Sequence, residues 1–289
     1  MNLPVALINT LWKIWLYDIE VLRKYLWSSK YNCTFCSDSY WRIGGSDFDI
    51  AFWTIEHKLV ILWWNDFHKL PDPQKSHFIE NKNSLPSWSQ EPGNKNWEEK
   101  IMNTEFYQAQ VEIVYTDPIK EVTLYQKYDI LNNLWQEKFD CRLFKNESKD
   151  IIEILNLCTK YKKIVLSSFD DFRSFITDWN ILILEGLDAN NLKISAGNAQ
   201  VEVKNDHWSR IILKNLLKQS CLPPLTSLED LMNLRNYVDH RANKEKTKNY
   251  NLFCSKAWTT VSEYMKIYYF LLDELIEEFD ILIKALDRA

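Results

Sequence analysis

The spacing of hydrophobic residues changes about half-way along the chain. Residues 49–55 and 59–64 are β-branched and aromatic runs separated by three polar residues, which is typical of two hairpin strands or one long bent strand. After about residue 150, apolar residues recur every three or four positions, which is typical of amphipathic helices. We therefore expect an α+β fold, with a mixed α/β N-terminal domain over residues 1–147 and an all-α domain over residues 148–289.

The same patterns predict the individual elements. In the first half we expect a helix over 8–26, a long surface loop over 65–99, strands over 108–116 and 121–125, and a helix over 128–139. In the second half we expect a short strand over 163–166, a small hairpin over 192–203, and helices over 169–187, 206–218, 225–240 and 255–286. Only 5 of the 289 residues are glycine, which argues against a glycine-rich phosphate cradle and a long flexible linker.

The charge balance limits the classes of partner. The chain has 35 basic and 40 acidic residues, a net charge of −5, so a globally basic coat for nucleic acid is excluded and any such site must be a local patch. The apolar N-terminal stretch has no basic residue before it and is interrupted by Lys13 and Asp18. It therefore fits neither a signal peptide nor a membrane span, and we expect a cytoplasmic protein without membrane contact and with reduced cysteines.

Residues 231–241 contain the most informative cluster of polar side chains. Arg235 and Asn236 lie next to each other near the end of an expected helix, and His240 follows five residues after the arginine. Histidine titrates near neutrality and can carry the proton of an RNA 2′-hydroxyl, while arginine can stabilise charge on a phosphate. Asn236 lies one helical turn before His240 and can orient the imidazole. On an ideal helix Arg235 and His240 point about 140° apart, so the long arginine must curl round the helix, the helix must end near His240, or a second copy must complete the site.

This Arg-Asn-x-x-x-His pattern, set in a helical domain and followed by a long helix, resembles the HEPN family of ribonucleases. The resemblance covers the C-terminal third to half of the chain. It implies a HEPN-like helical bundle that works as a two-fold homodimer and cleaves RNA without a metal or other cofactor. Arg235, Asn236 and His240 would be the catalytic residues, and the products would carry 2′,3′-cyclic phosphate or 3′-phosphate ends and 5′-hydroxyl ends. The resemblance also implies a role in a toxin–antitoxin or antiviral defence system, with an antitoxin or another defence protein as a partner.

A basic segment follows the histidine and predicts contacts with an RNA backbone. Its candidate RNA-binding residues are Arg241, Lys244, Lys246, Lys248 and Tyr250, the tyrosine as a ring on which a base can stack. The alternative is an ordinary charged loop between two helices.

Two other functions remain open from the sequence. Some HEPN domains lack activity, so the helical domain can be a non-catalytic dimerisation or RNA-binding module. Asp47 and Asp49, with Glu112 on a later strand, resemble the metal-binding carboxylates of nucleotidyltransferases, although the Gly-Ser that precedes them in that family is absent. Cys33 and Cys36 have the spacing of half a zinc site, but no second pair of this kind exists.

Overall fold

The computed structural model describes residues 14–82, 103–110, 112–162, 164–203, 208–240 and 243–288. The chain divides into two compact units, and each unit is built from two separate stretches of the sequence. The sheet unit contains residues 1–123 and 149–162, and the helical unit contains residues 124–148 and 163–289. The expected single boundary after residue 147 therefore differs from the observed division, because the chain leaves the sheet unit at residue 123 and returns to it for one helix.

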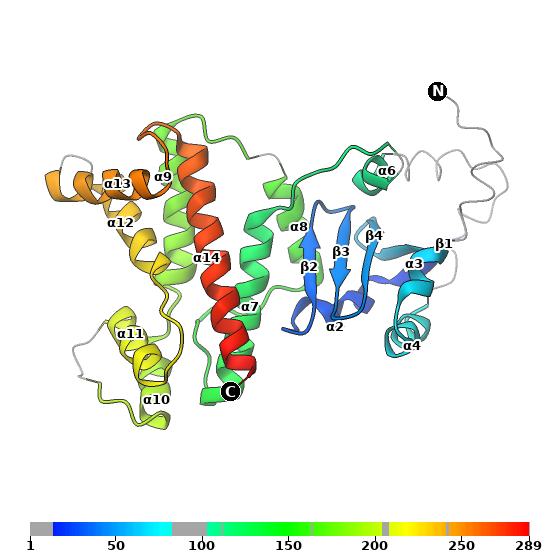
Figure 1. The fold of residues 1–289 in the computed structure, drawn as a ribbon, viewed down its shortest axis with the longest axis horizontal. Helices are drawn as coiled ribbons and strands as arrows, with labels where there is room; N and C mark the ends of the chain where they lie inside the picture. Colours follow the sequence, from blue (N-terminus) through cyan, green and yellow to red (C-terminus); the bar gives the residue numbers. More distant parts are fainter. Residues whose placement is uncertain are drawn as a thin grey trace. The chain divides into compact units, whose positions relative to one another are not determined.

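The sheet unit is built on a five-stranded antiparallel sheet with the order β1-β5-β4-β3-β2 (Figure 1). The strands are β1 (Ile14–Asp18), β2 (Asn32–Phe35), β3 (Trp41–Gly44), β4 (Asp49–Ile55) and β5 (Leu59–Trp63). β4 and β5 form the expected hairpin, and its turn places Glu56 and His57 at positive φ. The core of this unit is aromatic, with Trp53 fully buried and its ring centroid 4.3 Å from that of Phe106.

Short helices complete the sheet unit. They are η1 (Ile19–Leu22), α2 (Arg23–Leu26), α3 (Trp64–Lys69), α4 (Asp72–Glu80), α6 (Glu105–Gln110) and α8 (Ile151–Tyr161). Asp150 caps α8 by accepting a hydrogen bond from the backbone N–H of Glu153, whose carboxylate accepts one from the N–H of Asp150 in return.

The helical unit contains one hydrophobic core surrounded by helices (Figure 1). Its elements are most of α7 (Lys120–Phe139), α9 (Phe169–Trp179), the π-helix η3 (Asn180–Leu184), α10 (Ala189–Asn198), α11 (Ser209–Gln219), α12 (Ser227–Asp239), α13 (Lys244–Lys256) and α14 (Tyr264–Asp287). α14 buries a stripe that includes Leu271, Leu275 and Phe279, and Trp179 of α9 donates a hydrogen bond to the hydroxyl of Tyr268 at 2.9 Å.

Several expected elements differ from the structure. Residues 14–18 form an edge strand rather than part of a helix, because they pair in register with β5. Residues 64–69 and 72–80 form helices within the expected loop, and α6 and the first turns of α7 replace the two expected strands. Residues 164–166 have no regular structure, and α10 replaces the expected hairpin because Asp188 caps it through the N–H groups of Asn190 and Asn191. Residues 8–13 and 83–99 lie outside the described residues.

The coarse expectation is confirmed: the described residues form an α+β protein. No helix among them is both long enough and apolar enough to span a membrane.

Candidate functional site

α12 is anchored at its beginning and along its inner face. The Glu278 carboxylate of α14 accepts hydrogen bonds from the backbone N–H of Ser227 at 2.9 Å and from the Ser227 hydroxyl at 2.5 Å. Leu231 and Leu234 are fully buried in the core of the helical unit. These contacts fix the rotation of the helix and leave Arg235 and Asn236 partly exposed on its other side.

The helix ends where the candidate histidine begins. Asp239 is the last helical residue, and His240 lies outside the helix with φ −127° and ψ 45°. The backbone N–H of His240 still donates to the carbonyl of Asn236 at 3.0 Å, and its carbonyl accepts from the N–H of Asn243 at 2.8 Å. The rotation of about 100° per residue therefore no longer applies at His240, which meets one of the three alternative geometric conditions set by the sequence.

His240 is exposed, and within the described part of the chain its imidazole has neither a hydrogen bond nor an ion pair. Arg241, directly after it, lies outside the described residues. A neutral or protonated imidazole at this helix end is therefore open to a ligand from solvent, which is the property that a proton carrier needs.

Arg235 is held by an acidic neighbour. Its guanidinium forms an ion pair with the carboxylate of Asp239, one turn further along α12. The other carboxylate oxygen of Asp239 lies 3.6 Å from a guanidinium nitrogen of Arg173 on α9. Asp239 thus lies between two arginines, and this cluster connects the candidate site to a second helix.

The sequence reasoning gave no role to Asp239 or Arg173. The four-residue spacing of Arg235 and Asp239 is a local signal for an ion pair on a helix. Arg173 is far away in the sequence and has no such signal, because only the packing of α9 against α12 brings it to the site.

Tyr250 lies in the core, contrary to the expectation that a base stacks on it. Its ring is 1% exposed and parallel to that of Tyr237, with centroids 3.8 Å apart, and its hydroxyl donates to the carbonyl of Val261 at 2.7 Å. Burial raises its pKa far above the usual value. Tyr250 therefore joins α13 to α12 and to the turn before α14, and no face of its ring is open to RNA.

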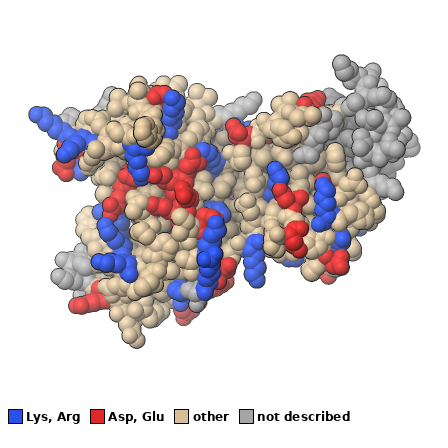
Figure 2. Space-filling view, in the orientation of Figure 1, with Lys and Arg blue, Asp and Glu red and all other residues tan. Residues whose placement is uncertain are grey.

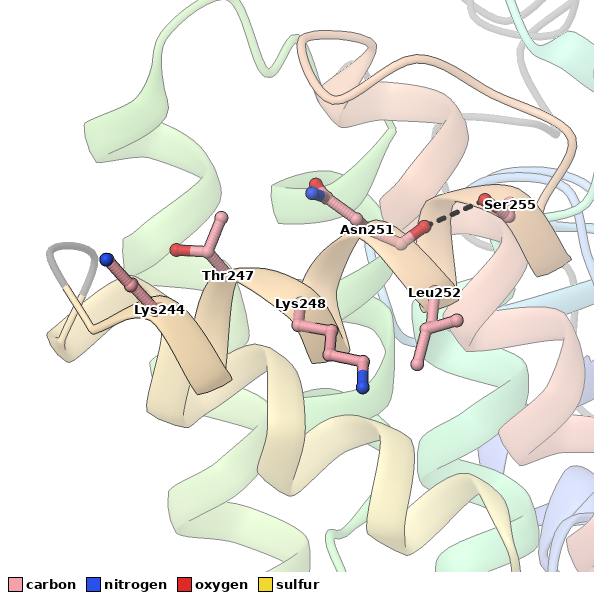
Figure 3. Close-up of a pocket in the computed structure, with 6 residues that line it drawn as sticks. All are labelled: Lys244, Thr247, Lys248, Asn251, Leu252 and Ser255. Atoms are coloured by element: carbon pink, nitrogen blue, oxygen red, sulfur yellow. Dashed lines mark hydrogen bonds between the residues drawn. The ribbon is translucent and has the colours of Figure 1, made fainter.

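The three lysines at the beginning of α13 lie at the surface. Lys244 and Lys248 are exposed and Lys246 is partly exposed, and among the described residues none of them forms an ion pair. Lys244 and Lys248 line a shallow groove of about 410 Å³ along one face of α13, together with Thr247, Asn251, Leu252 and Ser255 (Figure 3). These positive charges begin four residues after His240, with the exposed Glu245 among them, so the chain places a net basic surface beside the candidate proton carrier.

The alternative metal site in the sheet unit is not assembled in the described residues. Asp49 at the start of β4 forms an ion pair with Arg42 on β3, while Asp47 lies in the preceding turn and Glu112 lies exposed after α6. No group of three or more acidic, histidine or cysteine side chains in the described ranges is suited to hold a metal ion. The guanidinium of Arg42 offsets the negative charge of the Asp49 carboxylate, which makes that carboxylate a weaker ligand for a divalent ion.

Cys33 and Cys36 pack inside the sheet unit. Both thiols are buried, and Cys33 donates to the backbone carbonyl of Tyr25 at 3.4 Å. Burial raises the pKa of Cys36 to about 11, so its thiol is protonated at neutral pH. These cysteines therefore belong to the core.

No protein-family model, no curated protein and no solved structure matches this chain. The case for a function therefore comes from the residues and their geometry.

Proposed function

We propose that the protein is a metal-independent endoribonuclease of the HEPN type, with His240 as the proton carrier, Arg235 as the phosphate contact and Asn236 as an orienting group. The observation that carries this proposal is the open imidazole of His240 at the end of α12, five residues after Arg235 and four residues before the first lysine of α13. The expected homodimer, the cytoplasmic location, the role in defence and the antitoxin or other defence partner belong to the same proposal.

The chemistry is a transfer within the RNA strand. The 2′-oxygen attacks the neighbouring phosphorus as its proton passes to a base, and the bond from phosphorus to the 5′-oxygen breaks as that oxygen takes a proton. His240 serves as the base or as the acid, and in a two-fold dimer the partner's His240 fills the other role. The products are a 2′,3′-cyclic phosphate and a 5′-hydroxyl.

Arg235 must exchange one anion for another during this reaction. It is paired with Asp239, and the side chains of both residues are only about one quarter exposed, so the pair is partly buried. A phosphate oxygen can replace the Asp239 carboxylate because it supplies the same guanidinium with a charge-assisted contact in exchange.

The same ion pair favours a second function. If Arg235 stays on Asp239 when RNA is bound, the helical unit is a non-catalytic RNA-binding or dimerisation module. RNA then binds through the α13 lysines alone, and His240 has no catalytic role.

The experiment is a cleavage assay on total RNA in EDTA that compares the wild-type chain with His240→Ala. We expect the wild-type protein to produce fragments with 2′,3′-cyclic phosphate ends and the variant to produce none. RNA binding without cleavage by either protein would support the non-catalytic module. Cleavage that needs Mg²⁺ and is equal in both proteins would refute the role of His240.

A further inference from the structure

The most exposed aromatic side chain among the described residues lies at the end of α13. Trp258 is 94% exposed, and in the described structure its indole makes no ring contact and no side-chain hydrogen bond. A large apolar ring in water contributes nothing to the core.

The backbone at Trp258 adds a second observation. Its φ of 50° places it in the left-handed region. The N–H of Trp258 donates to the carbonyl of Ser255 at 3.2 Å, and the N–H of Thr259 donates to the carbonyl of Cys254 at 3.0 Å. This is the hydrogen-bond pattern of a Schellman helix end, in which glycine is strongly preferred at the left-handed position because it has no Cβ.

Tryptophan at this position is thus unfavourable for the stability of the folded state for two reasons. Its Cβ is disfavoured in the left-handed conformation, and its ring is left in solvent. Glycine would be more stable and would expose less apolar surface. The presence of tryptophan here has a physical explanation if the ring contacts a ligand.

The surface next to Trp258 indicates which ligand. Along the same segment lies the α13 groove, with exposed Lys244 and Lys248 near its beginning and the polar side chains of Thr247, Asn251 and Ser255 along it (Figure 3). The space-filling view shows basic side chains projecting where α13 begins (Figure 2). At the other end of α13, Lys256 is held by Asp230 and Glu274, so the free positive charge is confined to the beginning of the helix.

This composition fits a nucleic acid strand better than a protein. Lysine is depleted at protein interfaces, whose centres are usually apolar and aromatic. Two lysines that form no ion pair in the described residues and one open aromatic ring are the combination that binds single-stranded nucleic acid, because the cations contact phosphates and the ring stacks on a base. Leu252, which is 60% exposed, is the apolar part of the same surface.

We propose that Trp258 is the base-stacking residue of a single-stranded RNA site that runs along α13. Lys244 and Lys248 contact the phosphates, and the thirteen residues of α13 span about 20 Å from the lysines to the tryptophan. This inference rests on the proposed function only for the identity of the substrate as RNA. It assigns to Trp258 the stacking role that the sequence suggested for Tyr250.

The test measures binding separately from cleavage. A short fluorescein-labelled oligouridylate with 2′-O-methyl groups cannot be cut through its 2′-oxygen, so fluorescence anisotropy with the full chain reports affinity alone. Trp258→Gly should weaken binding about tenfold, since loss of one stacked base costs about 5- to 150-fold in Kd. The same variant should keep or raise Tm, because glycine suits the left-handed position better.

Two variants make the result specific. Trp208→Ala removes another indole of the helical unit, 79% exposed at the start of α11, and should leave Kd unchanged. Lys248→Gln should weaken binding and lower the slope of log Kd against log salt concentration by about one.

The stacking site and the proposed function fail in different ways. Wild-type affinity in Trp258→Gly, an equal loss in Trp208→Ala, or no binding of the oligonucleotide by the wild-type chain would each overturn the stacking site. A tenfold loss in Trp258→Gly supports the site even if His240→Ala still cleaves RNA, an outcome that overturns only the proposed function.

Discussion

The sheet unit and the helical unit differ in how far their side chains of reactive types are paired, buried or exposed to solvent. In the sheet unit Asp49 is paired with Arg42, Glu105 is paired with Lys162, and the Cys36 thiol is buried. In the helical unit His240 and two lysines of α13 face solvent, and in the described residues they have no ion-pair partner. Asp49 and Cys36 of the sheet unit are therefore paired or buried, whereas His240 and the two lysines of the helical unit remain open to a ligand.

The largest expected difference concerns the thiols. Burial raises the pKa of Cys36 from 9.0 to about 11, so its thiolate fraction at pH 8 is roughly 100-fold lower than that of an unperturbed thiol. Alkylation by iodoacetamide at pH 8 should therefore be about 100-fold slower at Cys36 than at an unperturbed thiol, and Cys221, which is exposed, should react first. Peptide mapping by mass spectrometry measures both rates. Equal labelling of Cys36 and Cys221 in the folded protein would contradict the buried, protonated state.

His240 in the helical unit and Asp49 in the sheet unit belong to the two candidate active sites, and substitutions at these residues distinguish between the sites. His240→Gln keeps a polar side chain of similar size but cannot carry a proton at neutral pH, so the rate of RNA cleavage should fall about 100-fold or more. Asp49→Asn removes the carboxylate from the sheet unit and should leave that rate within about twofold, because within the described ranges the Asp49 carboxylate has no ion pair other than its half-exposed one with Arg42. Initial rates on a fluorogenic RNA measure both. A larger loss in Asp49→Asn than in His240→Gln would place the chemistry in the sheet unit.

A smaller effect tests how Arg235 is used. Asp239→Asn removes the carboxylate between Arg235 and Arg173 and increases the local positive charge by one. The Kd for an uncleavable RNA should fall about threefold, consistent with the loss of a partly exposed competing ion pair. Anisotropy titration at low salt checks this value, and high salt should reduce the gain. Weaker binding would instead mean that Asp239 positions Arg235 for RNA.

Local patterns in the sequence predict those elements whose structure depends mainly on their own residues. The apolar spacing over 225–240 predicts α12, and the hairpin of β4 and β5 follows from two β-branched runs. The helix expected over 255–286 begins at Tyr264 as α14, and the separate helix α13 over Lys244–Lys256 was not predicted. The spacing gives the wrong prediction for residues 14–18, whose apolar residues also fit a helix. These residues form a strand because they pair with β5, a long-range contact that a local pattern does not show. α10 contains Gly197, which suggested a turn, yet its cap at Asp188 and burial of Leu192 favour a helix.

The candidate site shows the same limit. The residue types and their order in 235–248 point to phosphate chemistry, and the end of α12 at Asp239 agrees with the geometric condition derived from the helix repeat. The sequence could not show that Tyr250 is buried or that Trp258 is exposed, because both are aromatic residues in the same segment. Their difference comes from how α13 ends and which of its faces packs on Tyr237.

The smallest expected effect concerns Glu263, the residue before α14. Its exposed carboxylate accepts hydrogen bonds from Lys266, from the N–H and hydroxyl of Thr260, and from the hydroxyl of Thr259. The bond from Lys266 is the main cause that lowers its pKa from 4.5 to about 2, followed by the backbone N–H of Thr260. A lowered pKa in the folded state means that the charged form stabilises the fold above pH 4.5 and that this contribution is lost as the pH falls toward 2.

Glu263→Gln should therefore lower Tm at pH 7 by about 1–3 °C, and the difference from the wild-type chain should shrink as the pH falls from 4.5 to 2. Thermal melts followed by circular dichroism at several pH values measure the difference. Because the Glu263 side chain is partly exposed, 1 M salt should reduce the effect at pH 7. Glu277→Gln, in the middle of α14, is the matched control and should show no such pH-dependent difference. A Tm difference between wild type and Glu263→Gln that stays constant from pH 7 to pH 2 would show that the residue acts through packing rather than charge, and the turn that carries Trp258 would then not depend on an ionised cap.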